Sequence, residues 1–371
     1  MAETRAQEAL TPEIWDDQFS TEFFQANPFS RYMGTGANNP IRIKEDFASK
    51  RGNGITFEFI TALKRGAITG REPLRGHEDK LGEYADKIFW GMRKKAISIH
   101  ELDADLAAID LRKASKGALK DWADEDVKFQ ILEAAQAVGI DCDVPYADAS
   151  AADKNAWHNA NPDRVVYGEK LSNRVTGNHA ASLANITSAN GKMTKDTVSM
   201  IKRVALMARP RITPLRVEGI DKRFFVGFAH PFNFRDLVAS MSDAEIHVSM
   251  QSKNMLIFSG GDREYDGVVV HEVDDMPLIK GAGGSGIDVA PFYLLGQEAF
   301  GFASKSRYSS REQKDDYGQV QGLGMIGKWG AKKLAYTIGE DITVEDTSGG
   351  QTNVLGKQRG MVTGFYAATG D

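Results

Sequence analysis

The segment that decides the fold is residues 54–102, GITFEFITALKRGAITGREPLRGHEDKLGEYADKIFWGMRKKAISIHEL. Its first seven residues alternate apolar and polar side chains, with Ile55, Phe57 and Phe59 on one face. A period of two residues is typical of half-buried strands. Residues 87–102 alternate in a similar way, so the sequence predicts a β-hairpin formed by the two ends of this segment.

The connection between these strands, residues 61–86, is far longer than the common hairpin loop of about 2–5 residues. It is polar, interrupted by glycines, and has too few apolar residues to bury itself. We therefore expect it to lie on a partner surface, where its mixed charge would fix the register of the contact. A mobile surface loop is the alternative. The expected intermolecular contacts here and in the N-terminal region are Phe19, Phe23, Phe24, Lys64, Arg65, Arg71, Glu72, Arg75, Glu78, Asp79 and Lys80.

A stretch rich in Ala and Leu follows directly and predicts one long helix over residues 103–138. Asp103 and Asp105 would lie at its N-terminal end, where the helix dipole favours acidic side chains. Gly117 would bend or divide the helix, and Gly139 would end it. At about 1.5 Å per residue this helix would be roughly 54 Å long and would act as a strut. A coiled coil is the alternative, although the apolar positions keep no heptad for long.

Residues 1–47 combine a short expected helix, beginning near Thr11-Pro12-Glu13, with a stretch rich in Gly, Asn and Pro that is typical of an extended loop. The phenylalanines at positions 19, 23 and 24 would give the helix an apolar stripe. Such an arm docks either on another molecule or on its own domain. The arm lacks the features of a signal peptide, and no window reaches the run of about 18 apolar residues that a membrane span needs.

The rest of the chain changes character near residue 212. Residues 140–192 are rich in Asn, Ala, Asp and Gly, which predicts an irregular insertion with short helices. Thr194 would cap a helix that continues to about residue 208. After residue 212 short β-like runs dominate. Among them the sequence predicts a helix at 233–241 capped by Asn233, a turn at Asp266-Gly267 and a flexible loop at 281–286.

Composition excludes several kinds of function. The 371 residues carry a formal net charge of −5, with a pI near 5.9, so the overall charge does not favour nucleic-acid binding. The single cysteine, Cys142, excludes an intramolecular disulfide and a zinc site made of several cysteines, and it indicates folding in a reducing cytosol. The neighbouring Asp141 and Asp143 would raise the pKa of the thiol and so oppose a nucleophilic role.

No pattern in the sequence indicates an active site. Residues 322–327, GLGMIG, match G-x-G-x-x-G, but the sequence that follows is typical of a strand and not of the helix that a dinucleotide site needs. His271 and Glu272 lack the second histidine of a zinc-protease motif, and we expect an exposed strand end or loop there. The aspartates between residues 141 and 153 lack the EF-hand pattern. We therefore predict no catalytic residues, no metal and no cofactor.

Taken together, residues 52–139 resemble the capsid proteins of tailed phages with the Hong Kong 97-like fold, and look closest to the podovirus-type branch. The resemblance implies an α+β Hong Kong 97-like capsid fold with an N-terminal arm, an extended β-hairpin loop, a long spine helix, a peripheral domain and a β-rich axial domain. The implied divisions are the arm at 1–47, the extended loop at 48–102, the peripheral domain at 103–211 with its insertion at 140–192, the axial domain at 212–340 and a return to the peripheral sheet at 341–371.

The resemblance also implies a function: a major capsid protein that self-assembles into hexamers and pentamers of an icosahedral phage head around double-stranded DNA. The implied partners are further copies of the chain, the portal protein, scaffolding and decoration proteins, and packaged DNA through weak non-specific contact, with no membrane. Assembly in the host cytoplasm and a place in the virion are implied as well. Some members form a Lys–Asn crosslink, to which no residues here can be assigned. The alternatives are the shell protein of an encapsulin-type nanocompartment and a soluble nucleotide-binding enzyme.

Overall fold

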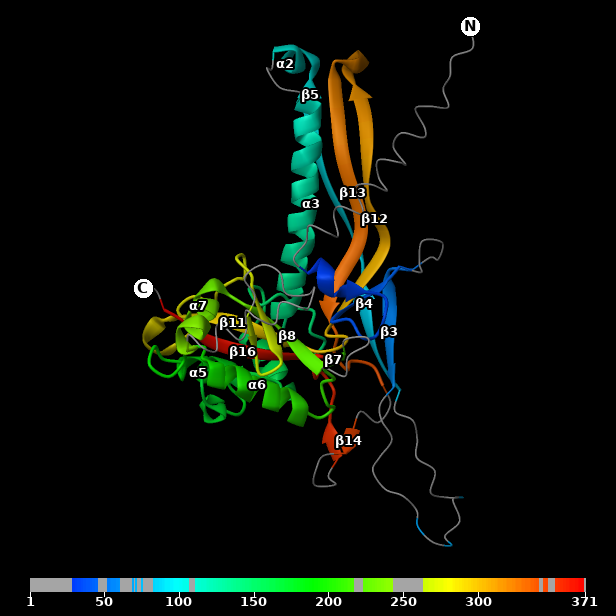
Figure 1. Ribbon diagram of the computed structural model, residues 1–371. Coiled ribbons are helices and arrows are strands. Elements are labelled where there is room, and N and C mark those ends of the chain that lie inside the picture. Colours follow the sequence, from blue (N-terminus) through cyan, green and yellow to red (C-terminus); the bar gives the residue numbers. More distant parts are fainter. Residues whose placement is uncertain are drawn as a thin grey trace.

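The computed structural model describes residues 29–45, 52–60, 83–106, 111–216, 223–242, 263–339, 343–345 and 351–369, with the single residues 69, 71 and 75. These ranges contain both helices and sheets (Figure 1). The α-helices are α2 (Glu101–Leu106), α3 (Leu111–Gln136), α4 (Ala151–Ala160), α5 (His179–Ala184), α6 (Lys195–Met207) and α7 (Pro231–Ser240). Short 3₁₀ turns are η1 (Ser30–Tyr32), η2 (Leu171–Asn173), η3 (Gly284–Gly286) and η4 (Asp316–Gly318).

One sheet has five strands in the order β1-β2-β12-β13-β5. Its strands are β1 (Met33–Gly34), β2 (Ile41–Lys44), β12 (Phe300–Asp315), β13 (Val320–Lys333) and β5 (Gly91–His100). β12 and β13 form a long antiparallel hairpin, and α3 runs beside it (Figure 1). Leu119, Ala123 and Val127 follow one another at four-residue spacing on α3, and they share a core with Leu323 and Met325 of β13.

The other large sheet has the strand order β6-β16-β11-β8-β10-β9, with β7 beside β8. Its strands are β6 (Val165–Tyr167), β16 (Met361–Ala368), β11 (Asp288–Leu295), β8 (Arg223–Ala229), β10 (Val268–Glu272), β9 (Arg263–Tyr265) and β7 (Leu215–Arg216). Successive side chains of β11 point to opposite faces. Phe292 and Leu294 pack with residues of α6 and α7, whereas Tyr293 and Leu295 pack with residues of α3. The middle of this sheet is therefore buried on both faces.

Two smaller sheets complete the description: β3 (Gly54–Ile60) with β4 (Glu83–Phe89), and β14 (Thr343–Glu345) with β15 (Gln351–Asn353). The predicted alternation of β3 is confirmed, because Ile55, Phe57 and Phe59 are buried and the residues between them are exposed. The single strand predicted over residues 87–102 is wrong. The chain divides at Trp90, so that β4 pairs with β3 while β5 pairs with β13 in the five-stranded sheet.

The described part of the predicted helix 103–138 is helical in α2 and α3, and residues 107–110 lie outside the described residues, so the continuity of the helix stays a prediction. α3 has 26 residues, about 39 Å at 1.5 Å per residue, and ends at Gln136. Gly117 lies inside α3 and does not divide it. Gly139 adopts a φ of +91° three residues after the helix ends, a backbone conformation that favours glycine.

The segment 140–192, predicted as an irregular insertion, packs into a core of the described fold. It contains short helices, as predicted, but it also supplies β6, which pairs in parallel with β16. Val165 and Tyr167 of β6 lie in a core with Trp157 of α4 and Phe365 of β16. The composition of the segment did not predict the pairing of β6 with β16, because its apolar residues are few and most of them are widely spaced.

The caps of the two later helices differ in how well they were predicted. Thr194 caps α6 as predicted. The cap of α7 is His230, whose Nδ1 accepts a hydrogen bond from the Phe232 backbone N–H at 3.2 Å. Asn233, the predicted cap, instead lies buried inside α7 and donates to the backbone carbonyls of β11 residues.

The strands of the C-terminal half belong to both large sheets, and the expected boundary between residues 340 and 341 stays a prediction. β12, a strand of 16 residues that was not predicted, and β13 pair with β2 and β5 near the start of the chain. β16 pairs with β11 and β6. The turn at Asp266-Gly267 is confirmed, with φ values of +49° and +70° between β9 and β10.

Candidate assembly surfaces

The β3–β4 hairpin is fixed to the body of the subunit by its buried face. Phe57, which is completely buried, shares a core with Ile88, Leu334 and Tyr336. Tyr84 of β4 packs edge-on against Tyr336, with 5.4 Å between the ring centroids. Since the core includes residues that follow β13, the hairpin is positioned by the same chain segment that ends the five-stranded sheet.

A buried carboxylate adds a polar anchor at the same place. Asp86 of β4 is completely buried and accepts from Lys332 Nζ at 2.6 Å, from the Ala335 backbone N–H at 3.0 Å and from the Thr337 hydroxyl at 3.0 Å. Burial raises the pKa of Asp86, and these donors oppose that rise. The hairpin is therefore held by directional bonds as well as by apolar contact.

The opposite side of the hairpin and the start of β5 expose large apolar side chains. Ile60 is 69% exposed, Phe89 59% and Met92 56%. Sequence reasoning missed these three residues as contact candidates. A signal was present: in the run Ile88-Phe89-Trp90 the alternation fails, which indicates apolar side chains on both faces of the chain. The register places Phe89 opposite Gly54 and Ile60 opposite Glu83, so the two side chains lie at opposite ends of the hairpin and provide separate candidate contact points.

Of the predicted charged contacts, the described residues include Arg71 and Arg75, and both are exposed. The other predicted contact residues lie outside the described ranges: Phe19, Phe23, Phe24, Lys64, Arg65, Glu72, Glu78, Asp79 and Lys80. Their role in intermolecular contact stays a prediction.

α3 is fixed to the five-stranded sheet by a polar contact in addition to its apolar face. Asp126 accepts from Arg93 Nη1 of β5 at 2.9 Å and from the Tyr308 hydroxyl of β12 at 2.7 Å. Trp122 packs edge-on against the Tyr308 ring at 5.7 Å. Burial raises the pKa of Tyr308, so the phenol stays protonated and donates to the carboxylate. These contacts join the helix to two strands and support its role as a strut.

The described part of the arm packs onto the large sheet that contains β8 and β10. The Phe29 and Phe228 rings meet edge-on at 4.8 Å, and the Tyr32 hydroxyl makes a hydrogen bond with His271 Nε2 of β10. The expectation that His271 lies at an exposed strand end is wrong, because Tyr32 and Phe228 cover it. This part of the arm docks on its own subunit, which was one of the two alternatives.

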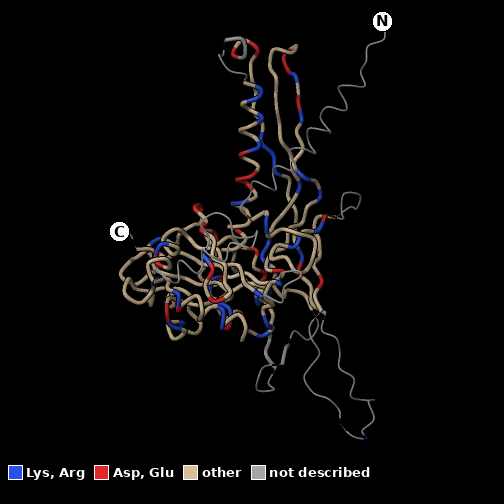
Figure 2. Tube along the Cα trace, in the orientation of Figure 1, with Lys and Arg blue, Asp and Glu red and all other residues tan. Residues whose placement is uncertain are grey.

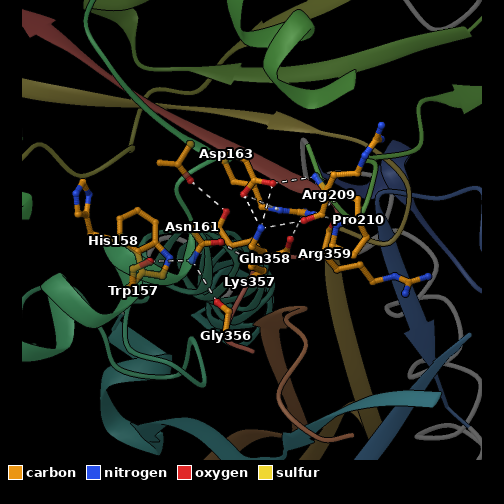
Figure 3. A network of polar contacts seen from close by, with 12 residues as sticks. Trp157, His158, Asn161, Asp163, Arg209, Pro210, Gly356, Lys357, Gln358 and Arg359 are labelled. Atoms are coloured by element: carbon orange, nitrogen blue, oxygen red, sulfur yellow. Dashed lines mark hydrogen bonds and ion pairs between the residues drawn. The ribbon is translucent and has the colours of Figure 1, made fainter. Parts of the chain in front are cut away.

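A buried polar network joins the loop after α4 to the segment before β16 (Figure 3). The Asn161 side chain donates to the carbonyls of Trp157 at 2.9 Å and Gly356 at 3.2 Å, and its Oδ1 accepts from the Gln358 backbone N–H at 2.8 Å. Asn161 and Gln358 are completely buried. An asparagine that bridges two segments in this way fixes their register without needing a strand pairing.

The same network contains a buried ion pair. Asp163 lies 3.1 Å from Lys357 Nζ and accepts from the Arg209 backbone N–H at 2.8 Å (Figure 3). Burial alone would raise the pKa of Asp163, but Arg164 and Lys357 hold it below its usual value. The completely buried Arg164 donates to the backbone carbonyls of Arg359 at 2.8 Å and of Gln358. Since its charged groups are paired and only Asp163 is partly exposed, this network has the character of a structural clamp.

The turn that joins β12 and β13 also exposes a large side chain. Tyr317 is fully exposed, and it follows Asp316 in the left-handed backbone region, with φ values of +53° and +48°. Residues other than glycine seldom adopt this conformation. The turn thus presents one aromatic ring at the tip of the longest hairpin.

The candidate sites for chemistry do not form an active site in the described residues. Gly322, Gly324 and Gly327 lie inside β13, where a Cβ at Gly327 would come within 2.8 Å of the Tyr308 ring. Burial raises the pKa of the completely enclosed Cys142 thiol. The described ranges hold no group of three or more His, Cys, Asp or Glu able to share a metal ion. Within the same ranges no helix is long and apolar enough to cross a membrane.

Comparisons with known proteins agree with this architecture. Residues 4–341 match the family described as phage capsid protein. The structure is similar to the capsid of cyanophage Pam1, with 27% sequence identity, a TM-score of 0.78 and 92% of each chain covered. It is also similar to the capsid of Ralstonia phage GP4, with 20% identity and a TM-score of 0.71 over 93% of this chain and 92% of that one. No curated protein matches the sequence.

The family match covers most of the chain, and the fold is similar to that of solved phage capsids over 92% of this chain for cyanophage Pam1 and 93% for Ralstonia phage GP4. The chain therefore belongs to the phage capsid protein family: it is a major capsid protein with an α+β capsid fold, a structural component of the virion and not an enzyme.

Proposed function

We propose that this capsid protein forms hexamers and pentamers of an icosahedral head that encloses double-stranded DNA, and that the β3–β4 hairpin and its connection make the principal contacts between subunits. The observation that carries the proposal is the exposure of Ile60, Phe89 and Met92 beside a hairpin whose other face is firmly anchored. The anchored face supplies rigidity, and the exposed side chains supply contact area.

The energetics favour a role for these side chains in assembly. Burying one large apolar side chain is worth roughly 1.5–3 kcal/mol, so each of these side chains can stabilise the contact in which it becomes buried. Permanent interfaces bury roughly 2,000 Å² or more. A subunit in a closed shell needs several such interfaces, and the exposed face of the hairpin and the Tyr317 turn are parts available to form them.

The proposed contact with DNA is weak and non-specific. α3 carries Lys and Arg in its first half and mainly Asp and Glu after Lys120 (Figure 2), and the neighbouring strands β5 and β13 carry Lys and Arg without Asp or Glu. These basic stretches are local, and the net charge of −5 opposes tight binding of a polyanion. The proposal further includes the portal protein as a partner, scaffolding and decoration proteins as possible partners, and assembly in the host cytoplasm, all of which follow from the role of a capsid subunit.

Particles purified from phage-producing cells test this proposal. Electron microscopy should show closed icosahedral shells with fivefold and sixfold clusters of the chain. Mass spectrometry should find a portal protein in the same particles, and opening them should release nucleic acid that a double-strand-specific deoxyribonuclease degrades. A small closed oligomer, or a shell that contains a co-purified enzyme in place of DNA, would overturn the proposal, the second result indicating a nanocompartment.

A further inference from the structure

The sheet formed by β12, β13 and β5 is covered by α3 on one of its two faces (Figure 1). Leu323 and Met325 of β13 lie on this first face, in the core that they share with α3. Side chains alternate between the faces along a strand, so Gly322, Gly324 and Ile326 belong to the second face. The β3–β4 hairpin covers the base of the second face, where it packs on the start of β12.

Beyond that base, the described part of the chain leaves the second face uncovered. A Cβ added at Gly324 would meet only atoms of the same sheet, the nearest of them at 3.7 Å. Ala96, which is paired with Gly324, is exposed. Small residues side by side make this surface flat. We name it the open face and define it by Lys94, Ala96, Arg311, Gly324, Ile326 and Lys328.

The open face is basic. Lys94 of β5 lies opposite Ile326 of β13, and Lys328 is two residues further along β13. Arg311 adds a third cation from β12. Within the described ranges, none of the three cations takes part in an ion pair. An acidic residue on the same side of β12, Asp315, lies four residues away at the hairpin tip. The open face therefore suits a partner that carries both acidic and apolar side chains.

Residues 1–28, which precede the described part of the chain, have this character. They contain six acidic residues and one basic residue, a formal charge of −5 that equals the charge of the whole chain. Residues 29–371 are therefore formally neutral. In the helix expected near the start of the chain, Asp16, Phe19 and Phe23 follow at spacings of three and four residues, which places them on one side. Flat aromatic rings beside a carboxylate match a flat strip beside cations.

The described part of the arm begins at the edge of the same sheet, since β1 is joined through β2 to β12 at Phe300. Ser306, which lies opposite Lys328, is six residues further along β12, a distance of about 20 Å. The segment between Asp17 and Phe29 spans about 18 Å as a helix and up to about 40 Å when extended. The acidic part of the arm can therefore reach the open face of its own subunit. The short tether keeps its local concentration there at about millimolar.

We propose that, in the free subunit before assembly, residues 11–24 lie on the open face of their own subunit. Their carboxylates pair with Lys94, Lys328 and Arg311, and their phenylalanine rings cover the strip around Gly324. The arm then shields this basic surface from nucleic acid and from other copies of the chain. Nucleic acid is the competing occupant, but the arm is favoured because it is tethered beside the open face and carries the unbalanced acidic charge.

Carbodiimide crosslinking of the purified full-length subunit tests the proposed position of the arm, because this reagent joins a carboxylate directly to a neighbouring lysine. Unlabelled and ¹⁵N-labelled subunits are mixed in equal amounts before the reaction. Mass spectrometry should find Asp16 or Asp17 joined to Lys94 or Lys328, with both peptides from the same isotopic form. The absence of these crosslinks, or crosslinks that combine the two isotopic forms, would overturn the proposal, the second result placing the arm on a neighbouring copy.

Lysine acetylation, also measured by mass spectrometry, tests the contribution of the arm's charge. The double variant Asp16→Asn with Asp17→Asn should raise the acetylation rates of Lys94 and Lys328 by about threefold, the equilibrium factor of one or two exposed ion pairs. Lys170, which is exposed at the start of η2 and lies outside the open face, serves as the internal reference.

A second double variant provides the matched control. Asp141→Asn with Asp143→Asn removes the same charge from two exposed positions outside the open face and should leave both acetylation rates unchanged. Equal rates in the two double variants and the unmodified subunit would overturn the proposal. Protection of Lys94 and Lys328 that appears only when a short DNA duplex is added would overturn it as well, in favour of nucleic acid as the occupant.

Discussion

Replacing Phe57 by alanine should loosen the β3–β4 hairpin from the subunit body. Phe57 is completely buried, and its ring meets Lys44 Nζ at 4.8 Å on one side and the core with Ile88 and Leu334 on the other. Removing a buried phenylalanine ring costs about 3–5 kcal/mol, because the transfer free energy is lost and a cavity remains. The lost stabilisation concerns a two-stranded hairpin, and such a hairpin is only marginally stable without packing against other elements. The hairpin should therefore detach before the rest of the subunit unfolds.

The neighbouring Glu58 provides the control, since its side chain points to solvent on the same strand. Glu58→Ala should change the stability by less than about 0.5 kcal/mol, as is usual for surface positions. Hydrogen exchange of soluble subunits should show faster exchange in β3 and β4 of Phe57→Ala alone, with α3 and β13 unchanged, and shells should fail to form. Equal exchange in the two variants would refute the idea that this core positions the hairpin.

Four further predictions concern assembly and stability. Deleting Gly70–Gly82 should leave a folded subunit that builds no stable shells, which circular dichroism and electron microscopy would show together; normal particles would count against the proposed role of the connection. Ile60→Asp should leave the unfolding midpoint of the free subunit nearly unchanged but prevent assembly, as measured by sedimentation. Gly327→Ala should destabilise the subunit by about 1–3 kcal/mol, because the new methyl group would press on the Tyr308 ring at 2.8 Å. Since burial lowers the pKa of His179 from 6.5 to about 3, its neutral form stabilises the fold fully above pH 6.5. That stabilisation is lost as the pH falls toward 3, by roughly 3 kcal/mol at pH 4. Replacing His179 by an uncharged residue should therefore reduce the loss of stability between pH 7 and pH 4 in denaturant titrations.

Local patterns predicted the elements whose stability comes from a simple amphipathic face. The alternation at Ile55, Phe57 and Phe59 predicted β3, and the stretch rich in Ala and Leu predicted most of α3. The family resemblance of the same segment was sufficient to predict the α+β capsid fold and the role of a capsid subunit, both of which the family match supports.

Elements that depend on distant partners were not predictable in this way. The outer half of β12, SSREQKD, is as polar as a loop, and it becomes a strand because β13 supplies its hydrogen bonds. His158 and His179 are separated by a polar stretch, and their meeting requires β6 to join β16. Asp86 gives no local sign of its anchoring role, since its donors lie about 250 residues away along the chain.

The measurement that tests the central claim most directly is a cryo-electron microscopy reconstruction of the assembled shell, from which the area buried on each residue by neighbouring subunits is calculated. The account predicts that Ile60, Phe89 and Met92, exposed in the single subunit, become largely buried against a neighbouring copy, while the core around Phe57 stays as it is. A shell in which these three side chains remain exposed to solvent would contradict it.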